Sequence, residues 1–184
     1  MNSFAYLFRA ICFSSIWYYH PTHRGVHGIG AGPDILIGNV AWLLRHLPVF
    51  GVFGDGTYRM QPGYVGDLAA LAVEAAAMKD NVVLDAVGPE IYAFNELLLL
   101  IRERIGSRSR IAHIPSAAAF AAGRALGWLL RDVIINRDEI GGLMAGLLAS
   151  DRPPTCPTRF SEWVREHTAE LGREYASESE RHYR

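Results

Sequence analysis

The sequence predicts an α/β fold, and two observations carry this prediction. From Asp34 onward, short apolar runs bounded by Gly and Pro alternate with longer segments of helical periodicity, and half of the 184 residues are hydrophobic. Such alternation is typical of strands that are covered by helices. The length fits one domain of ordinary size, and the apolar content excludes an intrinsically disordered chain.

The first part of this region predicts strands and helices in turn. Apolar residues at helical spacing predict a helix over Ile35–Leu47, which Pro48 ends. Val49–Phe53 is predicted to be a short buried strand, closed by a tight turn at residues 54–56. The next predicted elements are an extended stretch over Tyr58–Val65, an alanine-rich helix capped by Asp67 that runs to Met78, and a strand over Val82–Val87.

The second part predicts further helices. Glu96–Ile105 is a predicted helix that Gly106 ends, and Arg110–Ile114 is a predicted strand. The remaining predicted elements are a helix from Ser116 to Leu130, a short helix over Asp138–Leu148, a loop over Asp151–Pro157, an amphipathic helix over Phe160–Leu171 and a charged tail over Tyr175–Arg184.

Residues 1–33 differ from the rest of the chain because they contain no acidic side chain. The apolar stretch Phe4–Tyr19 is interrupted by Arg9, and it is shorter than the roughly 20 residues that span a bilayer. It also lacks the basic start and the cleavage site of a signal peptide. Its helical and strand signals disagree, so we expect a poorly specified segment over residues 1–27 and a domain over residues 28–184.

Charge and cysteine content exclude several function classes. The 18 basic and 19 acidic residues leave a net charge of −1, so no general attraction to nucleic acid or to an anionic membrane is expected. Cys12 and Cys156 show no C-x-x-C spacing, which argues against a disulfide scaffold or zinc site and favours a reducing, cytoplasmic location. The chain has 17 arginines and a single lysine, Lys79, so any chemistry that needs a lysine depends on that residue.

Two clusters before Asp34 are weak candidates for sites. Gly28 and Gly30 begin a dinucleotide-binding G-x-G-x-x-G pattern, but Pro33 stands where the third glycine belongs and no buried strand precedes it. Three histidines could form a metal cluster, but no predicted helix presents them at ligand spacing: His20, His23 and His27. A flexible connection and an incidental histidine cluster are the favoured interpretations.

Residues 54–69 are the most informative, because they join a tight turn, an arginine in extended chain and a helix: GDGTYRMQPGYVGDLA. This run resembles the GDG-x-x-R-x-Q-x-V-x-V-x-D-x-A segment in the C-terminal half of extended short-chain dehydrogenases/reductases, the NAD-dependent epimerase/dehydratase group. Other segments are similar in the same order: Gly28–Asp34, Asn39–Arg45, Pro48–Phe50, Gly88–Glu90, Phe94–Leu97, Arg137–Leu148 and Phe160–Trp163. Several of them resemble an atypical branch related to an accessory subunit of respiratory complex I.

The resemblance implies an incomplete Rossmann-type domain, with only its C-terminal, substrate-side part present over residues 28–184. In the family, a glycine-rich turn in the N-terminal half holds NAD(P), and a Tyr-x-x-x-Lys pair transfers the proton. Here Ala75 stands four positions before Lys79, so that pair is absent. We therefore expect that this chain alone neither binds NAD(P) nor catalyses the reaction, and we assign it no catalytic, cofactor-binding or metal-binding residue.

Three interpretations of function remain. The first is a truncated NAD(P)-dependent epimerase/dehydratase-like protein, in which an internal start or a shifted reading frame before Gly28 explains the acid-free beginning. The second is a non-catalytic binding or assembly module built on the same fold remnant. The third is a membrane-associated protein anchored by residues 4–19, against which Arg9 and the short span count. Since half a parallel sheet leaves an edge open, we also expect marginal stability and self-association through that edge.

Arg59 is the candidate ligand-binding residue. A guanidinium on an extended segment can bind a phosphate through two parallel hydrogen bonds. In the family the matching arginine commonly faces the substrate, often a nucleotide-sugar phosphate, and Asn39 matches a region that lines the same cleft. The resemblance therefore implies that Arg59 and Asn39 bind a small-molecule substrate. An ion pair with a nearby acid, such as Asp55 or Asp67, is the competing interpretation.

Overall fold

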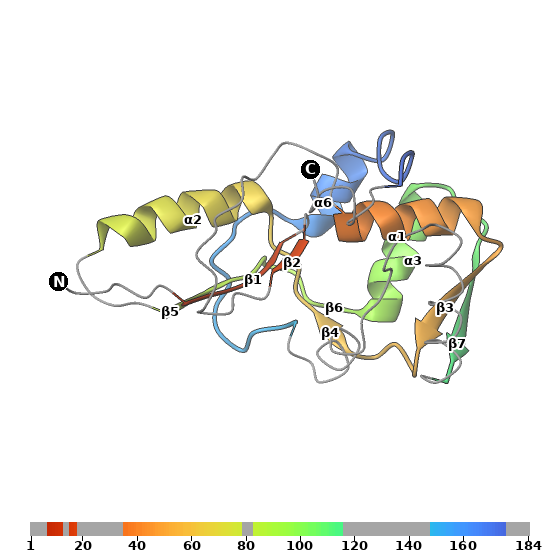
Figure 1. Ribbon diagram of the computed structural model, residues 1–184, viewed down its shortest axis with the longest axis horizontal. Coiled ribbons are helices and arrows are strands. Elements are labelled where there is room, and N and C mark those ends of the chain that lie inside the picture. The colour runs from red at the N-terminus through yellow and green to blue at the C-terminus, as the bar shows by residue number, and fades with distance from the viewer. Residues whose placement is uncertain (1–6, 13–14, 18–34, 79–82, 116–147, 176–184) are drawn as a thin grey trace, which may run out of the picture.

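The computed structural model describes residues 7–12, 15–17, 35–78, 83–115 and 148–175 (Figure 1). Within these ranges the chain is a mixed α/β structure with small sheets, which confirms the predicted class. The helices predicted over 116–130 and 138–147 and the tail over 176–184 lie outside the described residues. In chain order the elements are β1 (Leu7–Cys12), β2 (Ser15–Trp17), α1 (Ile35–His46), β3 (Val49–Phe53), β4 (Arg59–Met60), α2 (Val65–Ala77), β5 (Val83–Ala86), β6 (Tyr92–Ala93), α3 (Phe94–Arg104), β7 (Arg110–Ile114) and α6 (Phe160–Glu166).

The strands form three sheets, and none of them has more than three strands within the described ranges. β3 and β7 pair in parallel, with Val52 opposite His113 and Phe53 opposite Ile114. β4 and β6 form a short antiparallel pair. The third sheet has the order β2-β1-β5, with β1 antiparallel to β2 and parallel to β5. The predicted strands over 49–53, 82–87 and 110–114 are therefore confirmed, with β5 beginning one residue later and ending one residue earlier than predicted.

The N-terminal segment differs from the sequence-based expectation, because strands form where no element was predicted. Leu7 pairs with Val83 and Ala10 with Ala86, and β2 then returns along β1. This pairing joins backbone groups that are more than seventy positions apart in the chain. Local periodicity contains no information about such a distant partner, and strands form through partners rather than through local sequence alone.

Helix α2 begins at Val65, two residues before the predicted cap Asp67. The N-cap residue is Tyr64, which makes no side-chain capping bond. The Asp67 carboxylate instead accepts a hydrogen bond from the backbone N–H of Thr158, at 2.8 Å. The prediction that Asp67 caps this helix is therefore wrong. The side chain ties the first turn of α2 to the loop before α6.

Helix α3 begins at Phe94 because Glu96, its third residue, accepts a hydrogen bond from the backbone N–H of Ala93 at 2.8 Å. This contact satisfies a donor that the helix itself cannot pair. Gly106 ends the helix with φ of +66°, as the sequence predicts. α1 ends at His46, where the ring Nδ1 donates to the carbonyl of Trp42.

Helix α6 is shorter than predicted, since it ends at Glu166 rather than at Leu171. The Thr168 hydroxyl donates to the carbonyls of Val164 and Arg165, at 2.7 and 3.0 Å. Side-chain bonds of this kind compete with continued helix. The chain then proceeds through turns to Gly172, whose φ is +71°.

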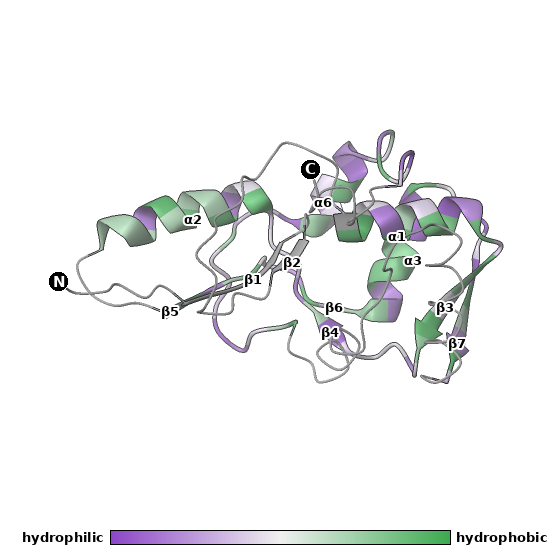
Figure 2. Cartoon of the chain, in the orientation of Figure 1, coloured by the Kyte–Doolittle hydropathy of each residue, from purple (hydrophilic) through white to green (hydrophobic). Residues whose placement is uncertain are grey.

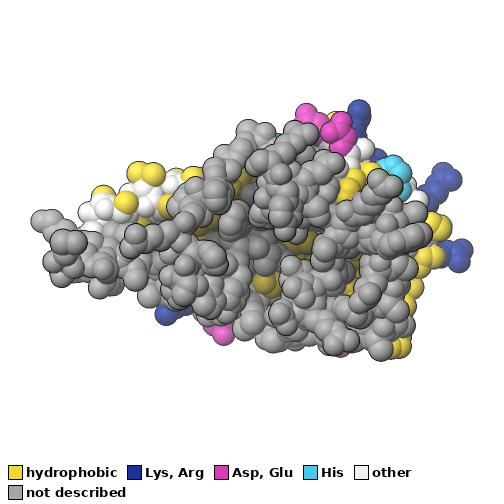
Figure 3. Space-filling view, in the orientation of Figure 1, with side chains coloured by type: hydrophobic (Ala, Val, Ile, Leu, Met, Phe, Trp, Pro, Cys, Tyr) yellow, Lys and Arg dark blue, Asp and Glu magenta, His cyan; other side chains and the backbone are white. Residues whose placement is uncertain are grey.

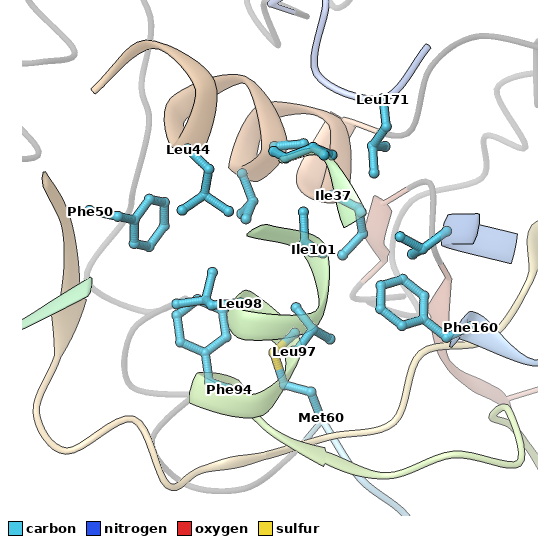
Figure 4. Packing of buried hydrophobic residues seen from close by; sticks show 14 of the residues in the cluster. Ile37, Leu44, Phe50, Met60, Phe94, Leu97, Leu98, Ile101, Phe160 and Leu171 are labelled. Carbon is cyan, nitrogen blue, oxygen red and sulfur yellow. The ribbon is translucent and has the colours of Figure 1, made fainter. Parts of the chain in front are cut away.

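The hydrophobic core lies between α1, α3 and α6, with β3 and β4 at its border (Figure 4). Its largest fully buried side chains are Leu44, Val52, Met60, Leu97, Leu98, Ile101, Phe160 and Val164. Helix α2 contributes none of the cluster residues, although Figure 2 shows that it is apolar along most of its length. No helix within the described ranges combines the length and the apolar content that a bilayer span requires.

Candidate functional site

Arg59 lies on β4, and its partner is an acid that the sequence did not indicate. The guanidinium Nη1 is 3.5 Å from Oδ1 of Asp151, and the two side chains are 53% and 96% exposed. The competing interpretation of Arg59, an ion pair with a nearby acid, agrees with this contact, although the acid is Asp151 and not Asp55 or Asp67. Asp151 comes from a loop 92 positions later in the chain, so no local pattern could identify it.

Asn39 lies on α1 and is partly buried. Helix α3 lies between α1 and β4 in Figures 1 and 4. The ion pair that the structure gives Arg59 is with Asp151 and not with Asn39. Ligand binding by either residue stays a prediction.

The loop that holds Asp151 is anchored by Gln61, two positions after Arg59. The Gln61 side chain is 2% exposed, its Nε2 donates to the carbonyl of Gly88 at 2.8 Å, and its Oε1 accepts from the N–H of Ser150 at 2.9 Å. Its backbone N–H donates to the carbonyl of Leu148. One buried amide therefore holds the segment after β4, the segment after β5 and the Asp151 loop in place. Sequence reasoning missed this role, because the partners of a buried amide depend on tertiary contacts.

Asp85, on β5, anchors the same loop from the other side. Its Oδ2 accepts a hydrogen bond from the Ser150 hydroxyl at 2.6 Å and lies 3.9 Å from Nε of Arg152. Its carbonyl accepts from the Thr155 hydroxyl at 2.7 Å. Asp151 is thus fully exposed at the tip of a loop whose neighbouring residues are fixed. We call Arg59, Asp151 and Arg152 the arginine surface.

A second polar group lies where the parallel strands β3 and β7 end. Gly54 and Gly56 have φ of +62° and +68°, so the turn between them requires glycine. Asp55 Oδ1 accepts hydrogen bonds from the N–H and the hydroxyl of Thr57, at 3.0 and 2.9 Å. These bonds, with a smaller electrostatic contribution from His113, hold the pKa of Asp55 below its usual value.

Asn95 links this turn to β7 and was not identified from the sequence. Its Nδ2 donates to the carbonyl of Asp55 at 2.8 Å, so its Oδ1 is the atom that meets Nε2 of His113 at 3.1 Å. Because an amide oxygen can only accept, His113 must carry a proton on Nε2. A β-carbon on Gly56 would collide with the Asn95 amide, so the turn glycine also makes room for this contact.

Glu90 is the most heavily bonded carboxylate of the described residues. It accepts hydrogen bonds from the N–H of Ser161 at 2.9 Å, the Ser161 hydroxyl at 2.8 Å and the Tyr92 hydroxyl at 2.8 Å, and Arg159 lies 3.1 Å away. Burial acts to raise the pKa of Glu90, but these bonds and the guanidinium outweigh it and hold the pKa below its usual value. The same burial, together with the bond to Glu90, raises the pKa of Tyr92, so its hydroxyl stays protonated.

The described residues do not fit a dinucleotide cofactor. A pyrophosphate needs a glycine-rich turn between a strand and the start of a helix. The described glycines with positive φ either precede β4, as Gly54 and Gly56 do, or follow a helix, as Gly106 and Gly172 do. Ala75, four positions before the single lysine Lys79, presents a buried methyl group.

Metal binding and thiol chemistry find no support among the described residues either. No three His, Cys, Asp or Glu side chains within these ranges are arranged to hold a metal ion. Burial raises the pKa of Cys156, so its sulfur stays in the weakly nucleophilic thiol form. Charged and amide groups of the described residues lie at the surface, where they form ion pairs and hydrogen bonds. No model of a known protein family matches this chain, and no curated protein matches it.

Proposed function

We propose that this chain forms the substrate-side part of a protein related to NAD(P)-dependent epimerases/dehydratases, and that it binds a phosphate-bearing small molecule at the arginine surface without transferring hydride itself. The proposal combines the motif resemblance with the position of Arg59. The absence of Tyr-x-x-x-Lys from the sequence excludes the family's proton transfer by this chain.

One observation carries the proposal: the segments that resemble the family contact one another. Residues 54–56 meet residues 94–97 through two hydrogen bonds from Asn95, to the carbonyls of Gly56 and Asp55. Residues 88–90 meet residues 160–163 through the Glu90–Ser161 bonds. A set of chance matches offers no reason for such direct bonding, whereas segments of one ancestral fold would be expected to pack in this way.

Arg59 has the properties that anion binding requires. Its guanidinium is half exposed, and its ion pair with Asp151 is long and faces solvent. Such a pair contributes at most about 1 kcal/mol, so a phosphate that accepts two hydrogen bonds can replace the Asp151 carboxylate at little cost. The nearby Arg152 adds positive charge beside the same loop.

The test is isothermal titration calorimetry with UDP-glucose as the phosphate-bearing probe. We expect binding to the wild-type chain, at least tenfold weaker binding to Arg59→Ala, and tighter binding to Asp151→Asn, which removes the competing carboxylate. Arg165→Ala is the matched control, because Arg165 is also exposed and ion-paired but lies on α6. Equal affinity of wild-type and Arg59→Ala chains, or no binding at all, would refute the proposal.

A further inference from the structure

The parallel sheet of β3 and β7 leaves one edge of β7 open. The N–H of Arg110 donates to the carbonyl of Pro48 at 2.9 Å, and the carbonyl of Ile114 also accepts a hydrogen bond from the β3 side. Because the backbone groups of a strand point to its two sides in turn, those of Ile111 and His113 point away from β3. Within the described ranges, these N–H and carbonyl groups have no hydrogen-bond partner.

An edge of this kind selects its partner by backbone geometry. Unpaired N–H and carbonyl groups follow one another along it, and an extended peptide presents the same groups at matching spacing. In Figure 1, β7 lies at the right-hand border of the molecule, and among the described strands β3 alone pairs with it. A short extended peptide can therefore add to β7 as a further strand.

Arginines surround this edge. Residues 101–115 contain one acid, Glu103, and four arginines: Arg102, Arg104, Arg108 and Arg110. Arg104, Arg108 and Arg110 are exposed, and none of these three forms an ion pair with another described residue. Figure 3 shows basic side chains at the right-hand end of the molecule, where Figure 1 places β3 and β7. The edge therefore lies in a region of uncompensated positive charge.

The helix ends nearby do not account for all of this charge. The C-terminal end of a helix attracts cations, and α1 and α3 both end here. Arg45 and Arg102 already donate to backbone carbonyls at these ends, at 3.3 and 3.4 Å. Arg108 and Arg110 lie beyond the last turn of α3, where the effect of the helix dipole falls off. Their guanidinium groups are available to an acid from outside the chain.

We propose that the open edge of β7 binds an extended acidic peptide of a partner protein, which adds to the sheet as a third strand. The peptide backbone bonds to the outward N–H and carbonyl groups of Ile111 and His113, and its carboxylates pair with Arg108 and Arg110. The backbone bonds hold the peptide, and the arginines select its charge. This contact does not depend on the proposed ligand binding, because Arg59 lies on β4, in a different sheet.

A second copy of this chain is a poorer partner for the same edge. Residues 107–115 contain no acid, so β7 of another copy offers nothing that could pair with Arg108 or Arg110. The self-association that the sequence suggested for an open edge therefore finds no charge complement at β7. An acidic strand from a different protein supplies both the backbone groups and the charge.

Fluorescence anisotropy tests the proposal with a fluorescein-labelled peptide of alternating glutamate and valine. We expect this peptide to bind the wild-type chain, and a matched peptide of alternating lysine and valine not to bind. His113→Pro should weaken binding at least tenfold, because proline removes one outward N–H while leaving the bonds to β3 in place. His113→Ala keeps that N–H and should bind within twofold of the wild type.

Two further pairs of variants separate the edge and the charge. Val49→Pro removes an outward N–H from the opposite edge, on β3, and should bind as the wild type does. Arg110→Glu should weaken binding at least tenfold, whereas Arg165→Glu, which changes an exposed arginine on α6, should not. Far-ultraviolet circular dichroism checks that each variant folds, and Arg108→Glu replaces any edge variant that does not.

Several results would overturn the proposal. One is a wild-type chain that does not bind the acidic peptide at several hundred micromolar. Another is a folded His113→Pro variant that binds normally, or a loss of binding in Val49→Pro instead. Labelled oligothymidylate that binds more tightly than the peptide, and is unaffected by His113→Pro, would assign the arginines to a nucleic acid. Saturating UDP-glucose should not displace the peptide, so failure of one proposal leaves the other standing.

Discussion

The two sides of the molecule use apolar residues in different ways. Around α1, α3 and α6, side chains from several elements converge, and residues such as Leu98 and Phe160 are completely buried. Around α2 and β5, burial is limited to a few residues, among them Ala75, Ala86 and Val87. Both regions are rich in apolar residues, so composition does not explain the difference. A core forms only where large side chains from several directions meet, and the small residues of α2 cannot fill such a space.

The largest loss of stability is expected at Leu98, in the core. Leu98→Ala should lower the free energy of unfolding by about 2–5 kcal/mol, because it removes buried methyl groups and leaves a cavity. Leu99→Ala, one position along the same helix, removes a side chain that is 45% exposed and should cost less than about 1 kcal/mol. Urea denaturation measures both losses. Equal losses would show that α3 does not bury Leu98 while leaving Leu99 exposed.

A loss of comparable size is expected at Gly172, where the chain after α6 meets α1. Its φ is +71°, and a β-carbon there would lie 2.5 Å from the carbonyl carbon of Ala41. Gly172→Ala should cost about 1–2 kcal/mol for the left-handed backbone and a further 1–3 kcal/mol, roughly, for the overlap. Gly106→Ala is the control, because Gly106 has φ of +66° but open space around it. In thermal unfolding, Gly172→Ala should be less stable than Gly106→Ala because only Gly172→Ala creates the overlap. Identical melting temperatures would contradict the close packing at Gly172.

A more modest loss of stability is expected when Arg45, on the same side of the molecule, is changed. Its guanidinium donates to the carbonyls of Leu171, Ile105 and Thr168, at 3.0, 3.3 and 3.3 Å, and so joins α1 to the ends of α3 and α6. Arg45→Lys keeps the charge but loses the planar set of donors, and should cost about 1 kcal/mol. Arg165→Lys changes an exposed arginine on α6 and should leave the urea midpoint unchanged. If Arg45→Lys has the same urea midpoint as the wild type, these hydrogen bonds do not hold the helix ends together.

Glu90 should make the free energy of unfolding depend on pH in the acid range. Its pKa is lowered in the folded state, so its contribution to stability is complete above the pKa of the unfolded chain, about 4.3, and is lost as pH falls through the folded value. Glu90→Gln should therefore be less stable than the wild type at pH 7, and the difference should shrink below about pH 4. Urea midpoints across this range measure it. A difference that stays constant with pH would mean that the Ser161 and Arg159 contacts do not depend on the charge.

The smallest effect is expected at Val73, on the exposed side of α2. Val73→Ala removes a side chain that is 73% exposed, so under dilute conditions it should change the free energy of unfolding by less than about 0.5 kcal/mol. Urea denaturation of the wild type and of Val73→Ala, both at low protein concentration, measures this difference. A large loss in the dilute sample would show that Val73 is packed within a single chain, and the contrast between the two regions would then be wrong.

Much of the fold after Asp34 could be predicted, because periodicity and breaking residues are local signals. The apolar spacing of α1, the strands β3 and β7, the turn at residues 54–56 and the end of α3 at Gly106 all follow from neighbouring residues. Two of the errors occurred where a distant partner decided the outcome. Asp67 bonds to Thr158 instead of capping α2, and Leu7–Cys12 becomes a strand through β5.

The candidate site shows the same limit. Sequence selected Arg59 for its charge, its extended position and the resemblance of its surroundings, and the structure places it at the surface beside Asp151. The sequence could not indicate that Gln61, Asn95 and Glu90 join the separate segments, because the partners of each residue lie on other elements. A polar residue reveals its type in the sequence but its partner only in the folded chain.

The amino-acid sequence by itself determined the α/β class, the places of α1, β3, β5, α3 and β7 along the chain and the absence of a Tyr-x-x-x-Lys pair, since these depend on residue type and short spacing. The tertiary structure decided which apolar segments share a core, which acid pairs with Arg59, and which helix keeps an open face. The physical reason is that burial and ion pairing are properties of contacts between distant segments, and the chain specifies those contacts only through the fold as a whole.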